Sequence, residues 1–216
     1  MKKKVILIVV LVLLVIGGGG AGAYYMQEKG KYVTTEDARV AGTIIRVSPQ
    51  ISGKLLSFSV EEGDLVQAGT VIANQETTNV PDNNVDMAAI KAPITGRVIK
   101  KSAEVGELVM PGQTIAQMVD FRSLYVEANI EEKEIAKLKV GQLVDIKIDA
   151  FPDAKLQGRV SEIGLATQST FSLLPATNTS GDFTKVVQRI PIKIVMEDTD
   201  LAIVPGMNTV IKIHVK

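Results

Sequence analysis

Two neighbouring stretches of the chain carry the same pattern, and this repeat limits the folds that the chain can adopt. Residues 51–73 read ISGKLLSFSVEEGDLVQAGTVIA, and residues 94–116 read ITGRVIKKSAEVGELVMPGQTIA. Three glycines keep their register between the two copies. Because glycine reaches positive φ without steric cost, we expect these glycines at tight turns between short strands. The predicted turn residues are Gly53, Gly63, Gly69, Gly96, Gly106 and Gly112.

Short β-strands are also predicted in the rest of the chain. The segments RVIK, LYVEANI, LVDIKIDA, VVQRIPIKIVM and NTVIKIHV are rich in β-branched residues, and several alternate apolar with polar residues. This period is typical of strands that bury one face. The segment NIEEKEIAKLKVG differs, because Asn129 and Glu132 form a capping-box pattern and Gly141 is a suitable helix stop. We expect a short helix there, with Ile135 and Leu138 facing inward. The predicted fold class is mainly β.

The first 26 residues differ in composition from the rest of the chain. Three lysines, at positions 2–4, precede an uncharged run at residues 5–26. As a helix this run would measure roughly 33 Å, close to the hydrocarbon thickness of about 30 Å. The lysines would stay in the cytoplasm, which predicts a single-pass cell-membrane protein with most of its chain outside the cytoplasm. A cleaved signal peptide is the alternative, since Ala21-Gly22-Ala23 fits a cleavage site.

These patterns divide the chain into four parts. We expect an anchor or signal peptide at residues 1–26, a membrane-proximal linker or strand at 27–46, the duplicated unit at 47–119 and a second β module at 120–216. The second module contains a long irregular stretch with apolar residues. Loops longer than about 15 residues are usually functional or act as linkers. Docking on a partner and packing against the module itself are both open for this stretch.

The sequence offers little material for catalysis or metal binding. Cysteine is absent and His214 is the only histidine, so a zinc site of Cys or clustered His ligands is excluded. A Ser-His-acid triad would need His214, which occupies an alternating strand position typical of a surface or packing histidine. Formal net charge is zero and no basic stripe is present, which argues against nucleic-acid binding. We predict no catalytic residue, no metal and no enzyme activity.

The duplicated unit resembles a biotinyl/lipoyl-type flattened barrel, which is built from two similar half-motifs. The phrase IKAPITGRVIK followed by VGELVMPGQTIA carries this resemblance. Carrier domains of this type attach their cofactor to a lysine at the hairpin tip between the halves. No lysine occurs from Leu55 to Ile90, while Lys54 lies too early and Lys91 too late for the tip. The sequence therefore predicts no attached cofactor.

Without the lysine, the chain resembles HlyD-type membrane fusion proteins, also called periplasmic adaptor subunits, of the EmrA-like branch. The stretches TTEDARVAGTIIRVSPQISGKL, FSLLPATNTSGDFTKVVQRIPIKI and LAIVPGMNTVIKI carry this resemblance, which covers roughly residues 34–213. The family's long coiled-coil hairpin is replaced by residues 75–89. Because a segment this short with Pro81 cannot form two antiparallel helices, the resemblance gives no support for contact with an outer-membrane channel.

The resemblance implies a membrane-anchored, non-enzymatic adaptor in an export or multidrug-efflux system. It implies an integral-membrane transporter of the major facilitator type as partner, and a homo-oligomer. A predicted partner-contact loop comprises Phe171, Ser172, Leu173, Leu174 and Pro175. The alternative is an exported, membrane-anchored binding or scaffold module that works without a transporter.

Overall fold

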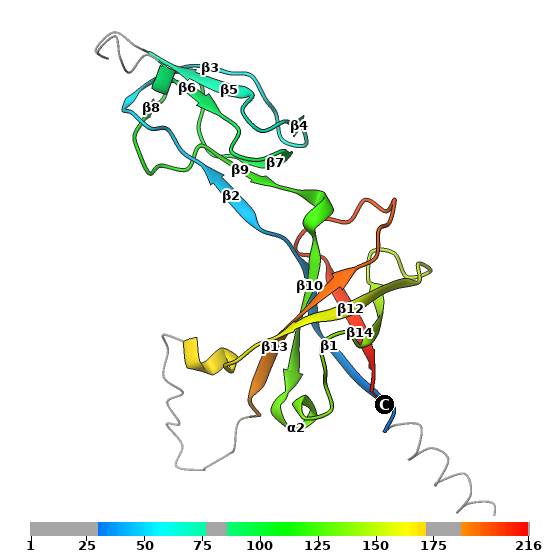
Figure 1. Ribbon diagram of the computed structural model, residues 1–216. Helices are drawn as coiled ribbons and strands as arrows, with labels where there is room; N and C mark the ends of the chain where they lie inside the picture. Colours follow the sequence, from blue (N-terminus) through cyan, green and yellow to red (C-terminus); the bar gives the residue numbers. More distant parts are fainter. Residues whose placement is uncertain (1–29, 77–85, 172–186, 216) are drawn as a thin grey trace, which may run out of the picture. The chain divides into compact units, whose positions relative to one another are not determined.

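The computed structural model describes residues 30–76, 86–171 and 187–215, and these residues form two compact units (Figure 1). The barrel unit comprises the described residues up to Arg39, those within Val126–Asp200, and those from Met207 onward. The sandwich unit comprises those within Val40–Tyr125 together with Leu201–Gly206. Within the described ranges, no helix has both the length and the apolar character needed to cross a membrane.

The barrel unit is a closed antiparallel barrel of six strands. The strand order is β1-β10-β13-β12-β11-β14. The strands are β1 (Tyr32–Ala41), β10 (Tyr125–Glu131), β11 (Leu143–Ile148), β12 (Leu156–Ile163), β13 (Arg189–Met196) and β14 (Asn208–His214). Alternation along these strands turns one set of β-branched side chains inward, as the sequence pattern predicts. In β14, for example, Ile211 and Ile213 are fully buried while Lys212 is exposed.

The helix of the barrel unit is shorter than expected and begins later. α2 (Glu132–Ile135) is the one α-helix within the described ranges, and Glu131 is its N-cap residue. The prediction that Asn129 caps this helix is wrong, because β10 continues through Asn129 to Glu131. Leu138 is buried as predicted, but it lies beyond the helix. Two 3₁₀ turns, η2 (Phe121–Ser123) and η3 (Gln168–Phe171), also occur within the described ranges.

The sandwich unit consists of two four-stranded sheets, and each half of the repeat contributes two strands to each sheet. One sheet has the order β2-β9-β7-β4 and the other β6-β5-β3-β8. The first half supplies β2 (Ile44–Val47), β3 (Gly53–Phe58), β4 (Leu65–Val66) and β5 (Val71–Gln75), and the second half supplies β6 (Ala89–Lys91), β7 (Gly96–Lys101), β8 (Leu108–Val109) and β9 (Ala116–Val119). Exchanging each strand with its counterpart in the other half converts one sheet into the other. Each sheet therefore contains strands from both halves.

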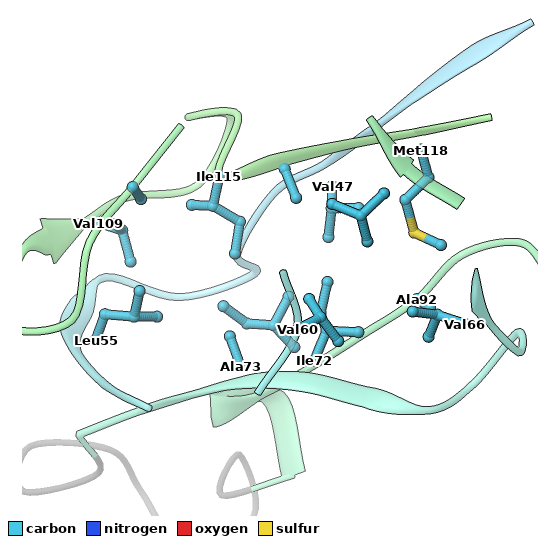
Figure 2. Close-up of a cluster of buried hydrophobic side chains, with 14 residues drawn as sticks. Val47, Leu55, Val60, Val66, Ile72, Ala73, Ala92, Val109, Ile115 and Met118 are labelled. Atoms are coloured by element: carbon cyan, nitrogen blue, oxygen red, sulfur yellow. The ribbon is translucent and has the colours of Figure 1, made fainter. Parts of the chain in front are cut away.

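The core of the sandwich unit lies between these two sheets (Figure 2). Small and β-branched side chains fill it, and the repeat supplies them in equivalent pairs. Ile72 and Ile115 are one such pair and are both fully buried. Leu55 and Val98 form another pair, with exposed fractions of 0% and 1%. No aromatic residue is among the buried members of this cluster, and Phe58 packs against it only partly buried.

The segment expected as a membrane-proximal linker, residues 27–46, is divided between the two units. Its part at Tyr32–Ala41 is β1, which pairs with β14 and completes the barrel. Its last three residues begin β2 (Ile44–Val47), which pairs with β9 of the sandwich unit. The return segment Leu201–Gly206 also belongs to the sandwich unit, although it follows β13 and precedes β14 of the barrel in sequence. The predicted anchor at residues 1–26 lies outside the described residues.

Candidate functional site

The duplicated turns of the sandwich unit have equivalent hydrogen bonds in both halves. The amide of Gly63 donates to the carbonyl of Val98 over 2.8 Å, and that of Gly106 donates to Leu55 over 2.7 Å. Each turn is also closed by the carboxylate that follows its glycine. An Asp64 oxygen accepts from the Glu61 amide over 2.9 Å, and a Glu107 oxygen accepts from the Glu104 amide over 3.1 Å.

Four of the six glycines predicted at turns have positive φ. The angles are +98° at Gly63, +83° at Gly69, +94° at Gly106 and +86° at Gly112. A side chain added at three of these positions would meet open space, and at Gly106 only the end of the Lys54 side chain lies within reach. Backbone conformation alone therefore explains why glycine occurs at these four turns.

Gly53 and Gly96 do not lie in such turns, which differs from the expectation. They are the first residues of β3 and β7, and neither has positive φ. Close packing explains the glycine at position 96, because a Cβ atom there would lie 2.4 Å from the carbonyl oxygen of Val119. At Gly53 the nearest contact would be 3.1 Å, to the carbonyl oxygen of Glu76.

Alanine at Gly63 or Gly106 should destabilise the sandwich unit by a similar amount. The left-handed conformation costs a residue with a Cβ atom about 1–2 kcal/mol, and the two backbone angles nearly coincide. Chemical denaturation of G63A and G106A, followed by hydrogen exchange of sandwich peptides, measures this loss. A loss in one variant that exceeds the other by more than about 1 kcal/mol would contradict the equivalence of the turns.

The two lysines nearest to the carrier position both lie on strands. Lys54 is in β3, opposite Leu108 of β8, and Lys91 is in β6, opposite Val71 of β5. Residues 76–88 connect β5 to β6 and contain no lysine. The chain has no residue at this connection to which biotin or lipoate could be joined through an amide.

A cavity of 340 Å³ lies in the barrel unit beside β1, β10 and α2. Its lining includes Asn129, whose side-chain amide donates to Asp37 over 3.0 Å. Arg189 of β13 forms an ion pair with the same carboxylate, and the Thr35 hydroxyl donates to the Asn129 carbonyl over 3.1 Å. This network joins β1, β10 and β13, so Asn129 serves the barrel and not a helix end. The ion pairs of Lys133 with Glu131 and of Lys137 with Glu134 also line this cavity.

Several other charged groups are paired at the surface. Arg122 donates to Asp120 and thereby lowers the pKa of that carboxyl, while Lys133 lowers the pKa of Glu131 in the same way. Glu61 forms an ion pair with Lys101, and its neighbour Glu62 accepts from the Lys101 amide. The adjacent carboxylates of Glu61 and Glu62 are therefore both bound by Lys101 at the surface. No group of three or more His, Asp or Glu residues suited to a metal ion occurs among the residues that the structure describes.

His214 lies half-buried on β14, with its Nε2 atom 2.7 Å from the carboxylate of Asp145. Its ring also meets the ring of Tyr32 edge-on, at 5.0 Å between centroids. This is the packing histidine expected from its strand position. Of the predicted partner-contact loop, Phe171 ends η3 and the other four residues lie outside the described ranges, so its role stays a prediction.

Known protein families match both units of the chain. The model described as RND MFP, barrel-sandwich hybrid domain, matches residues 43–121. The YknX-like beta-barrel domain matches residues 124–213. The two matches follow each other along the chain and together cover the duplicated region and most of the barrel strands.

Related proteins share these domains. The Bacillus subtilis (strain 168) protein named "Putative efflux system component YhbJ" is 38% identical over 182 residues, which are 84% of this chain and 79% of that protein. The multidrug export protein EmrA of Escherichia coli (strain K12) is 37% identical over 101 residues, which are 45% of this chain but only 26% of that protein.

Solved structures show the same fold at low sequence identity. The periplasmic adaptor protein EmrA aligns with a TM-score of 0.58 and 15% identity, covering 86% of this chain and 99% of that chain. The membrane fusion protein Spr0693 from Streptococcus pneumoniae R6 aligns with a TM-score of 0.62 and 14% identity, over the same shares of the two chains. Since both domains, a relative matched over most of its length and the fold agree, the chain belongs to the HlyD-type membrane fusion proteins, or periplasmic adaptor subunits, as a short EmrA-like member.

Proposed function

We propose that this protein is the membrane-anchored adaptor subunit of an export or multidrug-efflux system. The observation that carries the proposal is the succession of two adaptor domains, at residues 43–121 and 124–213, in one chain. The names of the relatives support efflux as the process, because they describe an efflux system component and a multidrug export protein. The adaptor is non-enzymatic, takes no cofactor and acts through contacts with other proteins.

The proposed partner is an integral-membrane transporter of the major facilitator type, and several adaptor copies assemble around it. The uncharged run at residues 5–26, behind three lysines, supports an anchor in the cell membrane with the two units outside the cytoplasm. Placed there, the adaptor receives exported compounds from the transporter and directs them away from the membrane.

Co-purification tests the partner. Detergent-solubilised membranes containing the tagged full chain should yield an integral-membrane transporter, and deletion of the gene should raise the cellular retention of a fluorescent efflux substrate such as ethidium. Retrieval of cell-wall or soluble proteins alone, with unchanged retention, would favour a scaffold that works without a transporter. A deletion strain that expresses the transporter alone is the control that separates loss of the adaptor from loss of the transporter.

Labelling from outside the cell tests the location. The chain contains no cysteine, so a single cysteine at exposed Val140 is a unique reporter. A membrane-impermeant maleimide should label Val140→Cys in intact cells, or in cells whose outer barrier has been opened. Labelling only after lysis would place the barrel unit in the cytoplasm and would contradict the proposed orientation.

A further inference from the structure

The cavity of the barrel unit lies at the end of the barrel where β1 begins. The first residues of β1, the last residues of β10 and the first residue of β13 line it, together with residues of α2. Figure 1 shows α2 at this end of the barrel. The volume of 340 Å³ is near the lower limit of ligand pockets, which measure about 300–1,000 Å³. The cavity is therefore large enough for a small polar group.

One buried polar atom of the cavity lining has no partner. Asn129 is only 9% exposed, and its side-chain oxygen Oδ1 accepts no hydrogen bond from any residue that the structure describes. The side-chain nitrogen donates to the carboxylate of Asp37, which can only accept, so this contact fixes the orientation of the amide. A buried acceptor without a donor lowers stability. A hydrogen-bond donor held in the cavity beside Asn129 would satisfy this oxygen.

Charged side chains of both signs surround the same cavity. Lys133 forms an ion pair with Glu131, and its side chain is 71% exposed. Lys137 forms an ion pair with Glu134, and its side chain is 47% exposed. Ion pairs in such exposed positions contribute little to stability, because water screens them. Both lysines can therefore turn toward a ligand without loss of the fold, and the cavity offers ammonium groups and carboxylates side by side.

A ligand that carries both charges matches this lining better than a simple anion or a simple cation. A simple anion would have to displace the carboxylates from the lysines, and a simple cation would have to displace the lysines from the carboxylates. With a zwitterion, each side chain exchanges its partner for another of the same sign. Phosphate is a strong partner for lysine, and a primary ammonium has three donors for the carboxylates and for Oδ1 of Asn129. These two groups together make phosphoethanolamine.

The position of the cavity in the chain favours a membrane lipid as the source of this group. Five residues separate Met26, the last residue of the uncharged run, from Tyr32, which begins β1 and lines the cavity. These five residues span at most about 18 Å when extended, and the polar layer of a bilayer is roughly 5–8 Å thick on each side. With the uncharged run in the membrane, as proposed above, the cavity stays within reach of the lipid headgroups.

We propose that this cavity binds the phosphoethanolamine headgroup of a membrane lipid. Lys133 and Lys137 bind the phosphate. The ammonium donates to the carboxylate of Glu134 and to Oδ1 of Asn129. The acyl chains remain in the membrane, so the bound headgroup holds the barrel unit at the membrane surface. The inference rests on the proposed function only for the anchor, which brings the cavity to the membrane, and binding of the free headgroup does not depend on it.

Hydrogen exchange of the purified full chain in a maltoside detergent tests the chemistry of the site. O-phosphoethanolamine should slow exchange of peptides from residues 129–137 about tenfold once its concentration exceeds its Kd about tenfold. Inorganic phosphate, ethanolamine and phosphocholine, which each lack one of the two groups or its N–H donors, should have little effect, and an equal response to phosphate would overturn the inference. Lys137→Gln and Glu134→Gln should each raise the Kd about tenfold. Lys147→Gln changes an exposed lysine of β11 outside the cavity and should leave the Kd unchanged.

Reconstitution of the full chain in lipid nanodiscs tests the source of the group. Discs that contain phosphatidylethanolamine should slow exchange of the same peptides, discs of phosphatidylcholine should not, and Lys137→Gln should remove the difference. Equal exchange in both kinds of disc would overturn the inference, whether or not free O-phosphoethanolamine binds, because the lipid headgroup would then not be recognised. A normal headgroup response without transporter co-purification would contradict the proposed function alone. Co-purification without a headgroup response would contradict this inference alone.

Discussion

Alanine at Gly96 should lower the free energy of unfolding of the sandwich unit by about 3 kcal/mol. The new Cβ atom would lie 2.4 Å from the carbonyl oxygen and 2.9 Å from the carbonyl carbon of Val119. Both atoms belong to the backbone of β9, which pairs with β7 and with β2, so β9 cannot move away without loss of hydrogen bonds to both neighbours. Denaturation by urea, read through hydrogen exchange of peptides from residues 96–119, measures the change.

Gly53 provides the matched control, because it occupies the same position in the other half of the repeat. A Cβ atom at Gly53 would approach the Glu76 carbonyl oxygen to 3.1 Å, a contact that a shift of a few tenths of an ångström relieves. Gly53→Ala should therefore cost less than about 1 kcal/mol. Peptides of the barrel unit serve as an internal reference. If the two substitutions lower the free energy of unfolding equally, the backbone of β9 shifts as readily as the end of β5, which would contradict the expectation.

Alanine at Ile213 should destabilise the barrel unit by about 3 kcal/mol. Ile213 is fully buried and lies opposite Val33 of β1 and Val144 of β11. Ile213 therefore lies in β14, the strand that pairs with both β1 and β11 and closes the barrel. Removing its outer carbons loses apolar burial and leaves a cavity among strands that cannot collapse without opening this closure.

Two milder substitutions distinguish the effect of the cavity on the stability of the barrel unit from the effect of substitution in general. Ile213→Val removes one methyl group and should cost about 1 kcal/mol, whereas Val195→Ala changes a half-exposed residue of β13 and should cost about 0.5 kcal/mol or less. Thermal unfolding followed by hydrogen exchange of peptides from residues 143–148 ranks the three variants. The explanation fails if Val195→Ala destabilises the barrel as much as Ile213→Ala does.

Features set by neighbouring residues could be predicted from the sequence. The strands of the barrel unit follow from alternation of β-branched and polar residues, as in the run from Asn208 to His214. The turns at Gly63 and Gly106 follow from the glycine and the carboxylate beside it. In each case the cause lies within a few residues of its effect, so the pattern contains the information.

Features set by distant residues could not be predicted in this way. Asn129 begins a correct capping pattern, yet its amide is bound by Asp37 and its segment stays in a strand between β1 and β13. Gly96 resembles a turn glycine in sequence, but it is required by the backbone of Val119 across the sheet. The chain has Val105 and Met110 at one turn where the other half of the repeat has Glu62 and Gln67. That these positions are structurally equivalent follows only from the exchange of strands between the two sheets.

The pairing of β5 with β6 allows the connection between these strands to differ in length while the sandwich stays the same. Asn74 and Ala89 lie opposite each other in this pair, so the two ends of the intervening connection are held together by the sheet itself. Once the ends are fixed, each doubling of a flexible connection adds only about 0.6 kcal/mol of closure entropy. A segment of almost any size can then enter or leave at this point while the sandwich keeps its stability. Evolution can therefore change the reach of such a protein independently of its fold.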